Sequence, residues 1–514
     1  MPKSDGSPIV LAADRSLTAA YPVLLDAMLV ASQTSTVPVA LLERLLLPRA
    51  RGADGARPDR TDALPGARLA PLGLRRIEAA LRHSGFGPDE VTVAEEAQLA
   101  RAIGKATRVV GISCAEAAGL GMSSTTMTAV AGGRILPQVM FERLLRKVRR
   151  AIKARAPQAR VVLGGAGAWQ AAGSPSLRKT LGLAHVVTGY AEGNAGGIFR
   201  DLLNGRALPE VLPGASVAGG AIPRILGAST LGAVELSRGC GLGCHFCTLA
   251  HIPMAHLPEE TILADIEINL AAGQNNVTLV SEDFFRYGGA GTRARPEALL
   301  ALLRRLRRSP ALRLLQIAHA NLLSISQFSD DELAAVHRLL AGDCPPGSVW
   351  VNVGVESASG ELLVKNGGGP KMGQAPAREW GEFCRAQTQR LIRAGFLPLV
   401  SLVMGLPGET LDDVRLTRDW VDGFADAPLA IFPVLYAPPD GSSAARGPTM
   451  RGEHWELMRI CYKFNFRHFP QLVRRNHALA GVPAARRWLA QVLGCGLKAR
   501  WAALLRFRAW QAKG

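Results

Sequence analysis

The stretch Glu235-Leu-Ser-Arg-Gly-Cys-Gly-Leu-Gly-Cys-His-Phe-Cys-Thr248 holds three cysteines in the spacing Cys-x3-Cys-x2-Cys. Thiolates this close in sequence can converge on one small object only if the backbone wraps around it. The interleaved glycines permit such wrapping, because a residue without Cβ tolerates positive φ. These glycines are Gly239, Gly241 and Gly243.

Three cysteines satisfy three irons of a cubane cluster and leave the fourth iron open. A structural zinc site would need a fourth ligand, and His245, between two of the cysteines, is the only close candidate. The spacing therefore favours an iron–sulfur cluster on Cys240, Cys244 and Cys247 over the alternatives of a zinc site or a disulfide.

This cysteine pattern, with aromatic Phe246 before the last cysteine, resembles the signature of the radical S-adenosylmethionine (radical SAM) enzymes. The resemblance implies a [4Fe-4S] cluster whose open iron binds the amino and carboxylate groups of S-adenosylmethionine. One electron, from an external donor such as flavodoxin or ferredoxin, would release a deoxyadenosyl radical. Cys240, Cys244 and Cys247 would then be both metal ligands and the catalytic centre.

The composition of the chain is globular, with 514 residues, 48% hydrophobic and 20% charged residues, which predicts two to four domains. The five remaining cysteines are scattered singly, so we expect one cluster and no disulfide framework, as in a reducing cytosol. Neither a signal-peptide pattern nor a membrane span is evident, which predicts a cytoplasmic protein. The single cysteines are Cys114, Cys344, Cys384, Cys461 and Cys495.

Strands and helices alternate six times in residues 230–440, which predicts a partial (β/α)6 barrel of the TIM type with its chemistry at the carboxyl ends of the strands. The expected strands are 234–237, 277–281, 312–317, 349–354, 399–404 and 430–435. The expected helices are 258–272, 296–307, 330–341, 377–394 and 410–424. The cysteine loop follows the first of these strands, at the edge where such a site is expected.

The resemblance extends to polar residues at the ends of later strands. It implies that Glu282, or else Asp283, meets the amino group of S-adenosylmethionine, and that Glu356 and Ser357 contact its ribose. It also implies that Gly405 and Gly408 let the backbone approach the adenine, although this segment equally fits an ordinary turn with Thr410 as a helix cap. Arg238 either tunes the cluster or caps its loop. Six further strand-end polar residues could face a substrate, although each fits a structural role when taken alone: Arg286, Tyr287, His319, Asn321, Lys371 and Tyr436. Of these, only His319 and Tyr436 are kept, as weak candidates.

Residues 1–207 also alternate strands and helices, which predicts a parallel, Rossmann-like sheet covered on both faces. This region resembles the cobalamin-binding domains that precede such barrels, and residues 208–229 read as a linker. The resemblance implies cobalamin contacts at Ser123, Thr125, Gly164, Gly165, Glu192 and Gly193. Many cobalamin domains place a cobalt-binding histidine after the first strand, but this chain has Ala12-Ala-Asp14-Arg-Ser there. Residues 14–70 contain an insertion that the sequence does not place.

With both cofactors, the resemblance implies a methyltransferase that acts on an unactivated carbon of a small-molecule or lipid-like metabolite. A radical SAM cyclase or rearrangement enzyme is the main rival. A methylthiotransferase is disfavoured, since that group carries a second cluster on three N-terminal cysteines and only Cys114 precedes Cys240. A non-catalytic cobalamin or redox sensor would not need the acidic strand ends.

Residues 441–514 read as a helical region that carries much of the positive charge, with +11 from Met450 onward against +18 for the chain. Residues 486–510 fit a basic amphipathic helix. Such a helix packs on its host domain or lies on a membrane surface, and we keep both alternatives. Nucleic acid is the less favoured partner, because a packing stripe explains the interleaved tryptophans equally well.

Overall fold

The computed structural model describes residues 5–47, 66–424, 426–438 and 450–512. The chain forms two compact units, one comprising residues 1–124, 132–234 and 260–274, and the other comprising residues 125–131, 235–259 and 275–514. The expected boundary between the barrel and the C-terminal region, at residues 440 and 441, lies outside the described residues. We describe each unit by itself.

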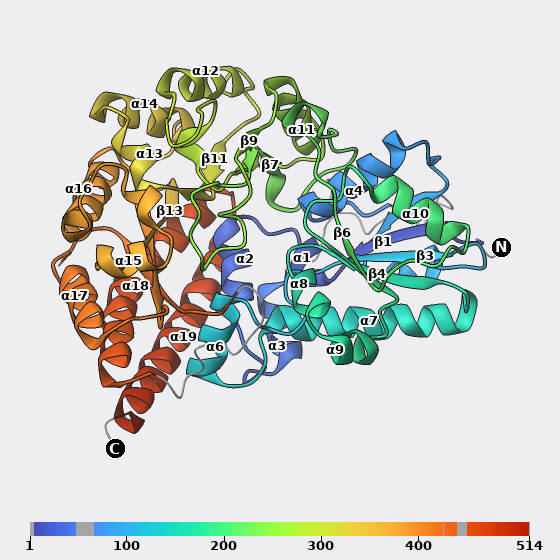
Figure 1. Cartoon of the computed structure of the whole chain (residues 1–514), viewed down its shortest axis with the longest axis horizontal. Coiled ribbons are helices and arrows are strands. Elements are labelled where there is room, and N and C mark those ends of the chain that lie inside the picture. The colour runs from blue at the N-terminus through green and yellow to red at the C-terminus, as the bar shows by residue number, and fades with distance from the viewer. Residues whose placement is uncertain (1–4, 48–65, 425, 439–449, 513–514) are drawn as a thin grey trace. The chain divides into compact units, whose positions relative to one another are not determined.

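The first unit is built on a six-stranded parallel sheet with the order β2-β1-β3-β4-β5-β6 (Figure 1). Strand β1 pairs in parallel with both β2 and β3. Because a tight turn cannot join two parallel strands, a crossover connection links each of these strands to the next. The strands are β1 (Ile9–Ala13), β2 (Val91–Ala94), β3 (Val109–Ser113), β4 (Arg160–Gly164), β5 (His185–Thr188) and β6 (Val211–Pro213).

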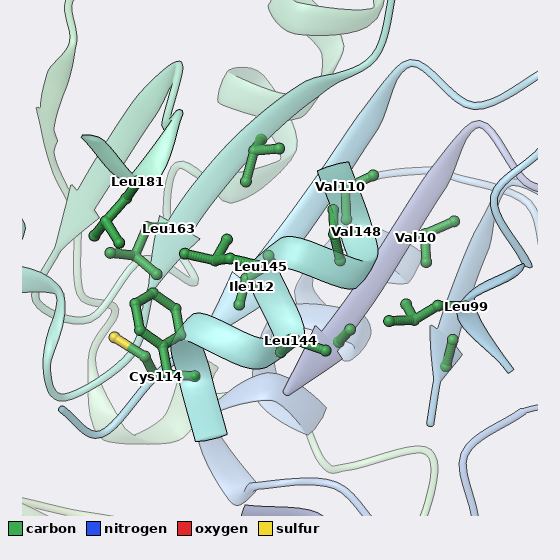
Figure 2. Close-up of a cluster of buried hydrophobic side chains, with 14 of the residues drawn as sticks. Val10, Leu99, Val110, Ile112, Cys114, Leu144, Leu145, Val148, Leu163 and Leu181 are labelled. Carbon is green, nitrogen blue, oxygen red and sulfur yellow. The ribbon is translucent and has the colours of Figure 1, made fainter. Parts of the chain in front are cut away.

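Alternating side chains of these strands supply two separate apolar cores, because neighbouring residues of a strand point to opposite faces. Val10, Val110 and Leu163 pack with Leu144 and other residues of α7 (Leu136–Arg155) on one face (Figure 2). The opposite face is covered by α4 (Leu72–His83) and α10 (Ala195–Leu203). The smaller helices of the unit are α5 (Leu99–Ala102), α8 (Ala168–Ala172) and α9 (Pro175–Leu181). Helix α6 (Met122–Ala131) begins in this unit, but its residues from 125 onward group with the second unit.

Two stretches of the first unit differ from the simple strand–helix pattern. The described part of the insertion after β1 forms three short helices, α1 (Arg15–Thr18), α2 (Leu24–Ala31) and α3 (Val39–Leu46), and a small apolar cluster packs this part against α7. The expected linker contains the edge strand β6, and its end is fixed by a hydrogen bond from Thr230 N to the carbonyl oxygen of Ala70. These segments are therefore integral parts of the unit.

The barrel strands lie near the six predicted positions, and one further short strand, β12, follows the third of them. All belong to the second unit except Ala233 and Val234 of β7, which group with the first. Strands β7, β10 and β11 form one sheet, and β12, β13, β14 and β15 form another. A hydrogen bond joins the two sheets, from Asn352 N of β13 to the carbonyl oxygen of Ala318, which lies between β11 and β12. The strands are β7 (Ala233–Glu235), β10 (Asn276–Val280), β11 (Leu314–Ile317), β12 (His319–Ala320), β13 (Trp350–Glu356), β14 (Leu397–Met404) and β15 (Ala430–Leu435).

The helices between these strands also follow the sequence pattern. They are α11 (Glu259–Ala271), α12 (Pro296–Leu306), α13 (Leu322–Ser326), α14 (Asp330–Ala341), α15 (Gly360–Lys365), α16 (Trp380–Arg393) and α17 (Leu411–Asp422). Most of α11 belongs to the first unit by its contacts: Asp265 is completely buried, pairs with Arg76 of α4 at 2.5 Å and accepts a hydrogen bond from Ile225 N.

Two long helices complete the second unit, α18 (Gly452–Leu479) and α19 (Ala484–Gln511). Buried Asn465 of α18 pairs through its amide with the backbone N–H and carbonyl of Ile431, which attaches the helix to β15. The predicted helix over residues 486–510 is confirmed. Among the described residues, none of the helices is both long and apolar enough to cross a membrane.

Candidate functional site

The cysteine loop leaves the barrel from a short antiparallel ribbon of β8 (Ser237–Arg238) and β9 (Ala255–His256). All three loop glycines have positive φ, +76° at Gly239, +72° at Gly241 and +77° at Gly243. At Gly239 a Cβ would lie 2.5 Å from the carbonyl oxygen of Pro253, so no other residue fits there. The loop therefore has the tight wrapping that the sequence predicts.

The three loop thiols are free and largely shielded from water. Burial raises the pKa of Cys244 to about 11 and also raises the pKa values of Cys240 and Cys247. Without a metal these groups are neutral thiols, so their conversion to thiolates is coupled to metal binding. Among the described residues no three His, Cys, Asp or Glu side chains are placed to hold one metal ion. A cubane has no such requirement, because each thiolate binds a different iron.

Asn366, a buried residue at the end of α15 that sequence reasoning missed, connects the loop to the segment after β14. The carbonyl oxygen of Asn366 accepts a hydrogen bond from His245 N at 3.0 Å, and its amide Nδ2 donates to the carbonyl oxygen of Pro407 at 3.0 Å. Gly367 then passes so close to the loop that a Cβ would lie 2.6 Å from Gly243 O. His245 is exposed, whereas Phe246 is buried and so anchors the loop from the inside.

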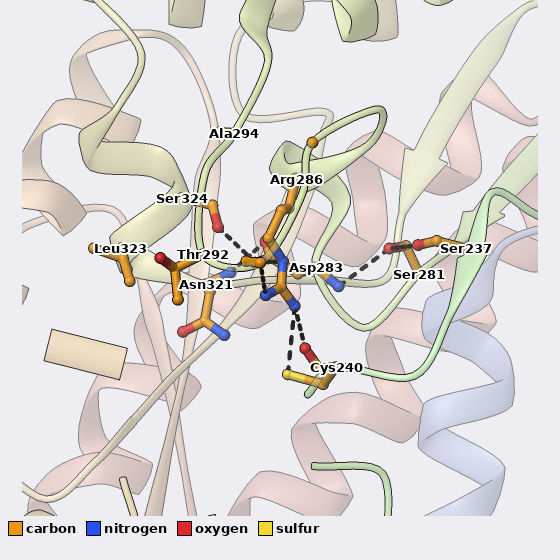
Figure 3. A network of polar contacts seen from close by, with 12 residues as sticks. Ser237, Cys240, Ser281, Asp283, Arg286, Thr292, Ala294, Asn321, Leu323 and Ser324 are labelled. Carbon is orange, nitrogen blue, oxygen red and sulfur yellow. Dashed lines mark hydrogen bonds and ion pairs between the residues drawn. The ribbon is translucent and has the colours of Figure 1, made fainter. Parts of the chain in front are cut away.

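A buried polar network reaches the first cysteine (Figure 3). The guanidinium of Arg286 donates from Nη2 to the carbonyl oxygen of Cys240 at 2.6 Å and to its Sγ at 3.7 Å. Asp283, which is completely buried, pairs with Arg286 Nε at 3.2 Å and accepts hydrogen bonds from Ser324 Oγ and Asn321 N. Arg286 is thus held rigidly against a candidate cluster ligand.

The two acids of the Ser281-Glu-Asp283 run therefore have different surroundings. Asp283 is engaged in the network that orients Arg286, while Glu282 is only half-buried. Burial raises the pKa of Glu282, with a further contribution from Glu235, and the Glu282 carboxylate in turn raises the pKa of Cys247. Both acids are coupled to the cysteine loop, since the Asp283 carboxylate raises the pKa of Cys240, but of the two only Glu282 keeps accessible surface. Its contact with the amino group of S-adenosylmethionine stays a prediction.

Arg238, which sequence reasoning considered for tuning the cluster, is held elsewhere. Its guanidinium makes two hydrogen bonds to the carboxylate of Glu235, at 2.9 and 2.8 Å. Arg286, considered only as a weak substrate-facing candidate, is the arginine with a hydrogen bond to a cysteine sulfur. No sequence signal distinguishes the two, because both arginines lie within a few residues of a strand end.

Glu356, at the end of β13, forms a buried ion pair with Lys371. Its Oε1 lies 2.6 Å from Lys371 Nζ, which also donates to the carbonyl oxygen of Gly354 at 3.0 Å. Burial alone would lower the pKa of Lys371, but the Glu356 carboxylate and the Cys244 thiol outweigh it and raise the pKa to about 12. Glu356 also has a φ of +66°, a strained value for a residue with a side chain. Such strain concentrates at functional sites.

Ser357 is completely enclosed, and its hydroxyl is already engaged. Ser357 Oγ lies 3.1 Å from Thr417 Oγ1 and accepts a hydrogen bond from Ser359 N. These bonds stabilise the turn into α15, and the ribose contact of Ser357 stays a prediction.

A cavity of about 400 Å³ lies at the end of β14. The predicted adenine segment lines it through Gly405 and Gly408, both with positive φ. Thr410 and Asp413 form a capping box for α17, which confirms the cap role of Thr410, while the adenine contact of this segment stays a prediction. Glu409 accepts hydrogen bonds from Gly405 N and His454 Nε2, both within 2.9 Å, which fixes the shape of the cavity wall.

Three polar residues lie side by side on neighbouring barrel strands. His319 of β12 is in register with Asn352 of β13, whose Oδ1 accepts a hydrogen bond from Ser401 Oγ of β14 at 2.7 Å. Desolvation lowers the pKa of the His319 imidazole, and the Glu356 carboxylate opposes this shift. His319 nevertheless keeps accessible surface. Sequence reasoning selected only His319, since Asn352 and Ser401 lie within the strands. Tyr436, the other weak candidate, is half-buried after β15.

The predicted cobalamin-binding residues lie at or beyond the carboxyl edge of the first unit's sheet, with one exception. Gly164, at the end of β4, has open space where a Cβ would stand, whereas a Cβ on Gly165 would lie within 2.9 Å of Ser113 and Cys114 atoms. Gly165 is therefore required by the fold itself. Glu192 is half-buried, and Gly193 bonds to Ala215 O. Ser123 is exposed in the first unit, but Thr125 belongs by its contacts to the second.

Asp14, at the place where many cobalamin domains have their histidine motif, caps α1. Its Oδ1 accepts hydrogen bonds from Ser16 N at 2.8 Å and from Ser16 Oγ. Burial raises its pKa to about 6, and the Ser16 bonds only partly offset this effect. The carboxyl end of β1 thus carries a buried acid.

Comparison with known proteins gives two kinds of similarity, while no family model matches the chain. The uS12 methylthiotransferase RimO of Trichlorobacter lovleyi is 25% identical over 258 residues, covering 48% of this chain and 51% of RimO. RimO of Leptospira biflexa is 24% identical over 224 residues, covering 43% of this chain and 44% of RimO. The chain spans about half the length of the curated relatives that it matches.

Among solved structures, the chain resembles the radical SAM methyltransferase TsrM of Kitasatospora setae, determined with cobalamin and a [4Fe-4S] cluster bound. The TM-score is 0.52 at 18% identity, over 84% of this chain and 77% of TsrM. A TsrM structure with tryptophan substrate and a SAM analogue gives the same TM-score at 17% identity. These likenesses confirm the predicted α/β fold class and the resemblance to radical SAM enzymes.

Proposed function

We propose that the protein is a cobalamin-dependent radical SAM methyltransferase that adds a methyl group to an unactivated carbon of a small-molecule or lipid-like metabolite. The observation that carries the proposal is the glycine-wrapped cysteine loop at the carboxyl end of the first barrel strand, with Arg286 bonded to one of its sulfurs. The fold likeness to TsrM, which was solved with cobalamin and a cluster, supports the same assignment.

The donor set fits a [4Fe-4S] cluster held by Cys240, Cys244 and Cys247. Three thiols on one loop match the ligand number of a cluster with an open iron, and the loop glycines let the backbone turn around a bulky group. When bound, the cluster would deliver the electron that cleaves S-adenosylmethionine. The role of the chain is to exclude water with Phe246 and to hold Cys240 beside a fixed positive charge.

Residues at three strand ends would bind S-adenosylmethionine in this proposal. Glu282 has an accessible carboxylate to accept hydrogen bonds from the amino group. Glu356, which is paired with Lys371, would accept hydrogen bonds from the ribose hydroxyls, and the adenine would enter the cavity beside Gly405 and Gly408. Lys371 keeps its positive charge at neutral pH and so balances the anionic groups of this site.

Cobalamin would supply the methyl group and would bind at the carboxyl edge of the first unit's sheet. The open space over Gly164 fits a nucleotide tail that passes the end of β4. The chain places Asp14 rather than a histidine after β1, so this motif provides no imidazole for the cobalt. Glu192 and Ser123 remain candidate polar contacts for the group.

Two alternative reactions are considered beside methyl transfer. A radical SAM cyclase or rearrangement enzyme, with or without cobalamin, would use the same cluster and S-adenosylmethionine, and its product would distinguish it. Methylthiotransfer is suggested by the similarity to RimO. That reaction is disfavoured, because the sequence has a single cysteine, Cys114, before the barrel loop, and Cys114 is buried in the sheet core.

Anaerobic reconstitution with iron, sulfide and hydroxocobalamin tests the proposal. We expect iron near four per chain, retained cobalamin, and both deoxyadenosine and S-adenosylhomocysteine once a reductant and S-adenosylmethionine are added. Replacing any one of Cys240, Cys244 and Cys247 by alanine should abolish nucleoside cleavage, whereas Cys495→Ala, at an exposed single cysteine, should not. Deoxyadenosine without retained cobalamin would contradict the methyltransferase assignment, and zinc in the loop would contradict radical chemistry altogether.

A further inference from the structure

Helix α19 presents apolar side chains on two opposite sides. One side packs on α18: Trp501 and Leu505 are buried, and the Trp501 ring stacks on Tyr462 with 5.2 Å between centroids. Val492 and Trp510 lie nine residues before and after Trp501, which is about two and a half helical turns. They therefore point away from α18.

The outward side of α19 is unusually apolar for a free surface. Trp488 is 67% exposed, Val492 48%, Phe507 49% and Trp510 71%. Five of the nine large apolar side chains that are exposed among the described residues lie on this one helix, the fifth being Leu489. Tryptophans stand near both ends of the stripe, and tryptophan is the residue that favours the boundary between water and hydrocarbon.

The charge of the same helix is of one sign. α19 contains six Lys/Arg residues and no acidic residue: Arg486, Arg487, Lys498, Arg500, Arg506 and Arg508. A second copy of this face would be repelled by equal charge, and a nucleic acid would leave Val492 and Leu489 without an apolar partner. An anionic lipid surface satisfies both properties, since its headgroups attract the cations and its acyl boundary accepts the apolar stripe.

We propose that α19 binds the surface of an anionic membrane, lying in its plane with Trp488, Val492, Phe507 and Trp510 inserted. Its apolar stripe is interrupted by Arg506 and flanked by other cations, so the helix lies on the bilayer and does not cross it. Because α19 packs on α18, and α18 is bonded to β15, the barrel would be held at the lipid surface. This inference does not depend on the reaction that the barrel performs.

The test is co-sedimentation of the full chain with vesicles of phosphatidylcholine alone and of phosphatidylcholine mixed with phosphatidylglycerol. We expect binding to the anionic vesicles only, weakened as salt is raised. Trp488→Ser with Trp510→Ser should lower vesicle affinity about tenfold, since two inserted rings are lost. Arg486→Gln with Arg506→Gln should weaken binding to a similar degree and reduce its salt dependence.

Matched controls come from the same unit. Leu416→Ser removes an apolar side chain of similar exposure from α17, and Arg304→Gln with Arg308→Gln removes two exposed cations near the end of α12. Neither change should alter vesicle binding. Absence of binding to anionic vesicles at low salt would overturn the proposal, as would a chain that self-associates, or binds duplex DNA instead, through the tryptophans of α19.

Discussion

The guanidinium of Arg286 lies 3.7 Å from the Sγ of Cys240 and donates a hydrogen bond to the carbonyl oxygen of the same residue at 2.6 Å. Its position is imposed by Asp283, which is itself fixed by Ser324 and Asn321. A cation bonded to a thiolate stabilises the more negative, reduced form of any cluster that the thiolate holds. Arg286 is thus a positioning residue with a measurable electrostatic effect.

The first prediction concerns the reduction potential of the reconstituted cluster. Asp283→Asn with Arg286→Met removes the network without leaving a buried charge, and the midpoint potential should fall by about 60 mV, the equivalent of one charge-assisted hydrogen bond. Electron paramagnetic resonance during a redox titration measures it. Arg307→Met serves as control, because Arg307 bonds only to backbone carbonyls at the amino-terminal side of β11. An equal shift in both variants would show that the Cys240 contact is not the cause.

The second prediction concerns the buried pair of Glu356 and Lys371. Lys371→Met should destabilise the second unit by about 3 kcal/mol, because it leaves an uncompensated carboxylate that is almost completely shielded from water. Unfolding in urea measures the loss. The double change Glu356→Gln and Lys371→Met should recover much of that stability while it removes the acceptor that we assign to the ribose. A double variant as unstable as the single one would contradict this account.

The third prediction concerns Asp14. Burial raises its folded pKa to about 6 from an ordinary value of 3.8. The folded state therefore holds the proton more tightly, so the stability from Asp14 is complete below pH 3.8 and is lost as the pH rises through about 6. Asp14→Asn keeps the cap and removes the titration. Its stability relative to the unchanged protein should therefore increase by about 1 kcal/mol between pH 5 and pH 7.

Thermal unfolding at the two pH values checks the Asp14 prediction. Ser16→Ala, which removes the side-chain hydrogen bond that opposes the shift and leaves the bond from the backbone N–H, should extend the loss to higher pH. A difference between Asp14→Asn and the unchanged protein that does not vary with pH would contradict burial as the origin of the raised pKa.

The fourth prediction concerns Gly164. Leucine there would fill open space at the end of β4 without meeting any atom near its Cβ, so the fold should persist. If the tail of cobalamin uses this space, retention of hydroxocobalamin should fall about tenfold or more, as measured by absorption after gel filtration. Gly197→Leu, at an equally open glycine of α10, is the control. Unchanged retention in Gly164→Leu would remove β4 from the proposed binding edge.

The elements were predictable because their signals are local. Strand β14 and helix α14 have apolar residues at spacings that only one kind of structure can bury, and Ser329 with Glu332 marks the start of α14 as a capping box. The cysteine loop was predictable from its glycines for the same reason. Strand β6 was missed, because three residues at a sheet edge carry no period.

What the sequence by itself determined is therefore the set of strands, helices and loop ligands, since spacing along the chain controls which faces are apolar and which backbone turns are allowed. Only the tertiary structure decided which polar groups meet: Arg286 rather than Arg238 at the Cys240 sulfur, Lys371 at Glu356, and Asn366 between the cysteine loop and Pro407. The physical reason is that these partners lie far apart in the sequence, 46 residues for Cys240 and Arg286 and 41 for Asn366 and Pro407. Desolvation in the folded barrel, not sequence proximity, makes each contact energetically necessary.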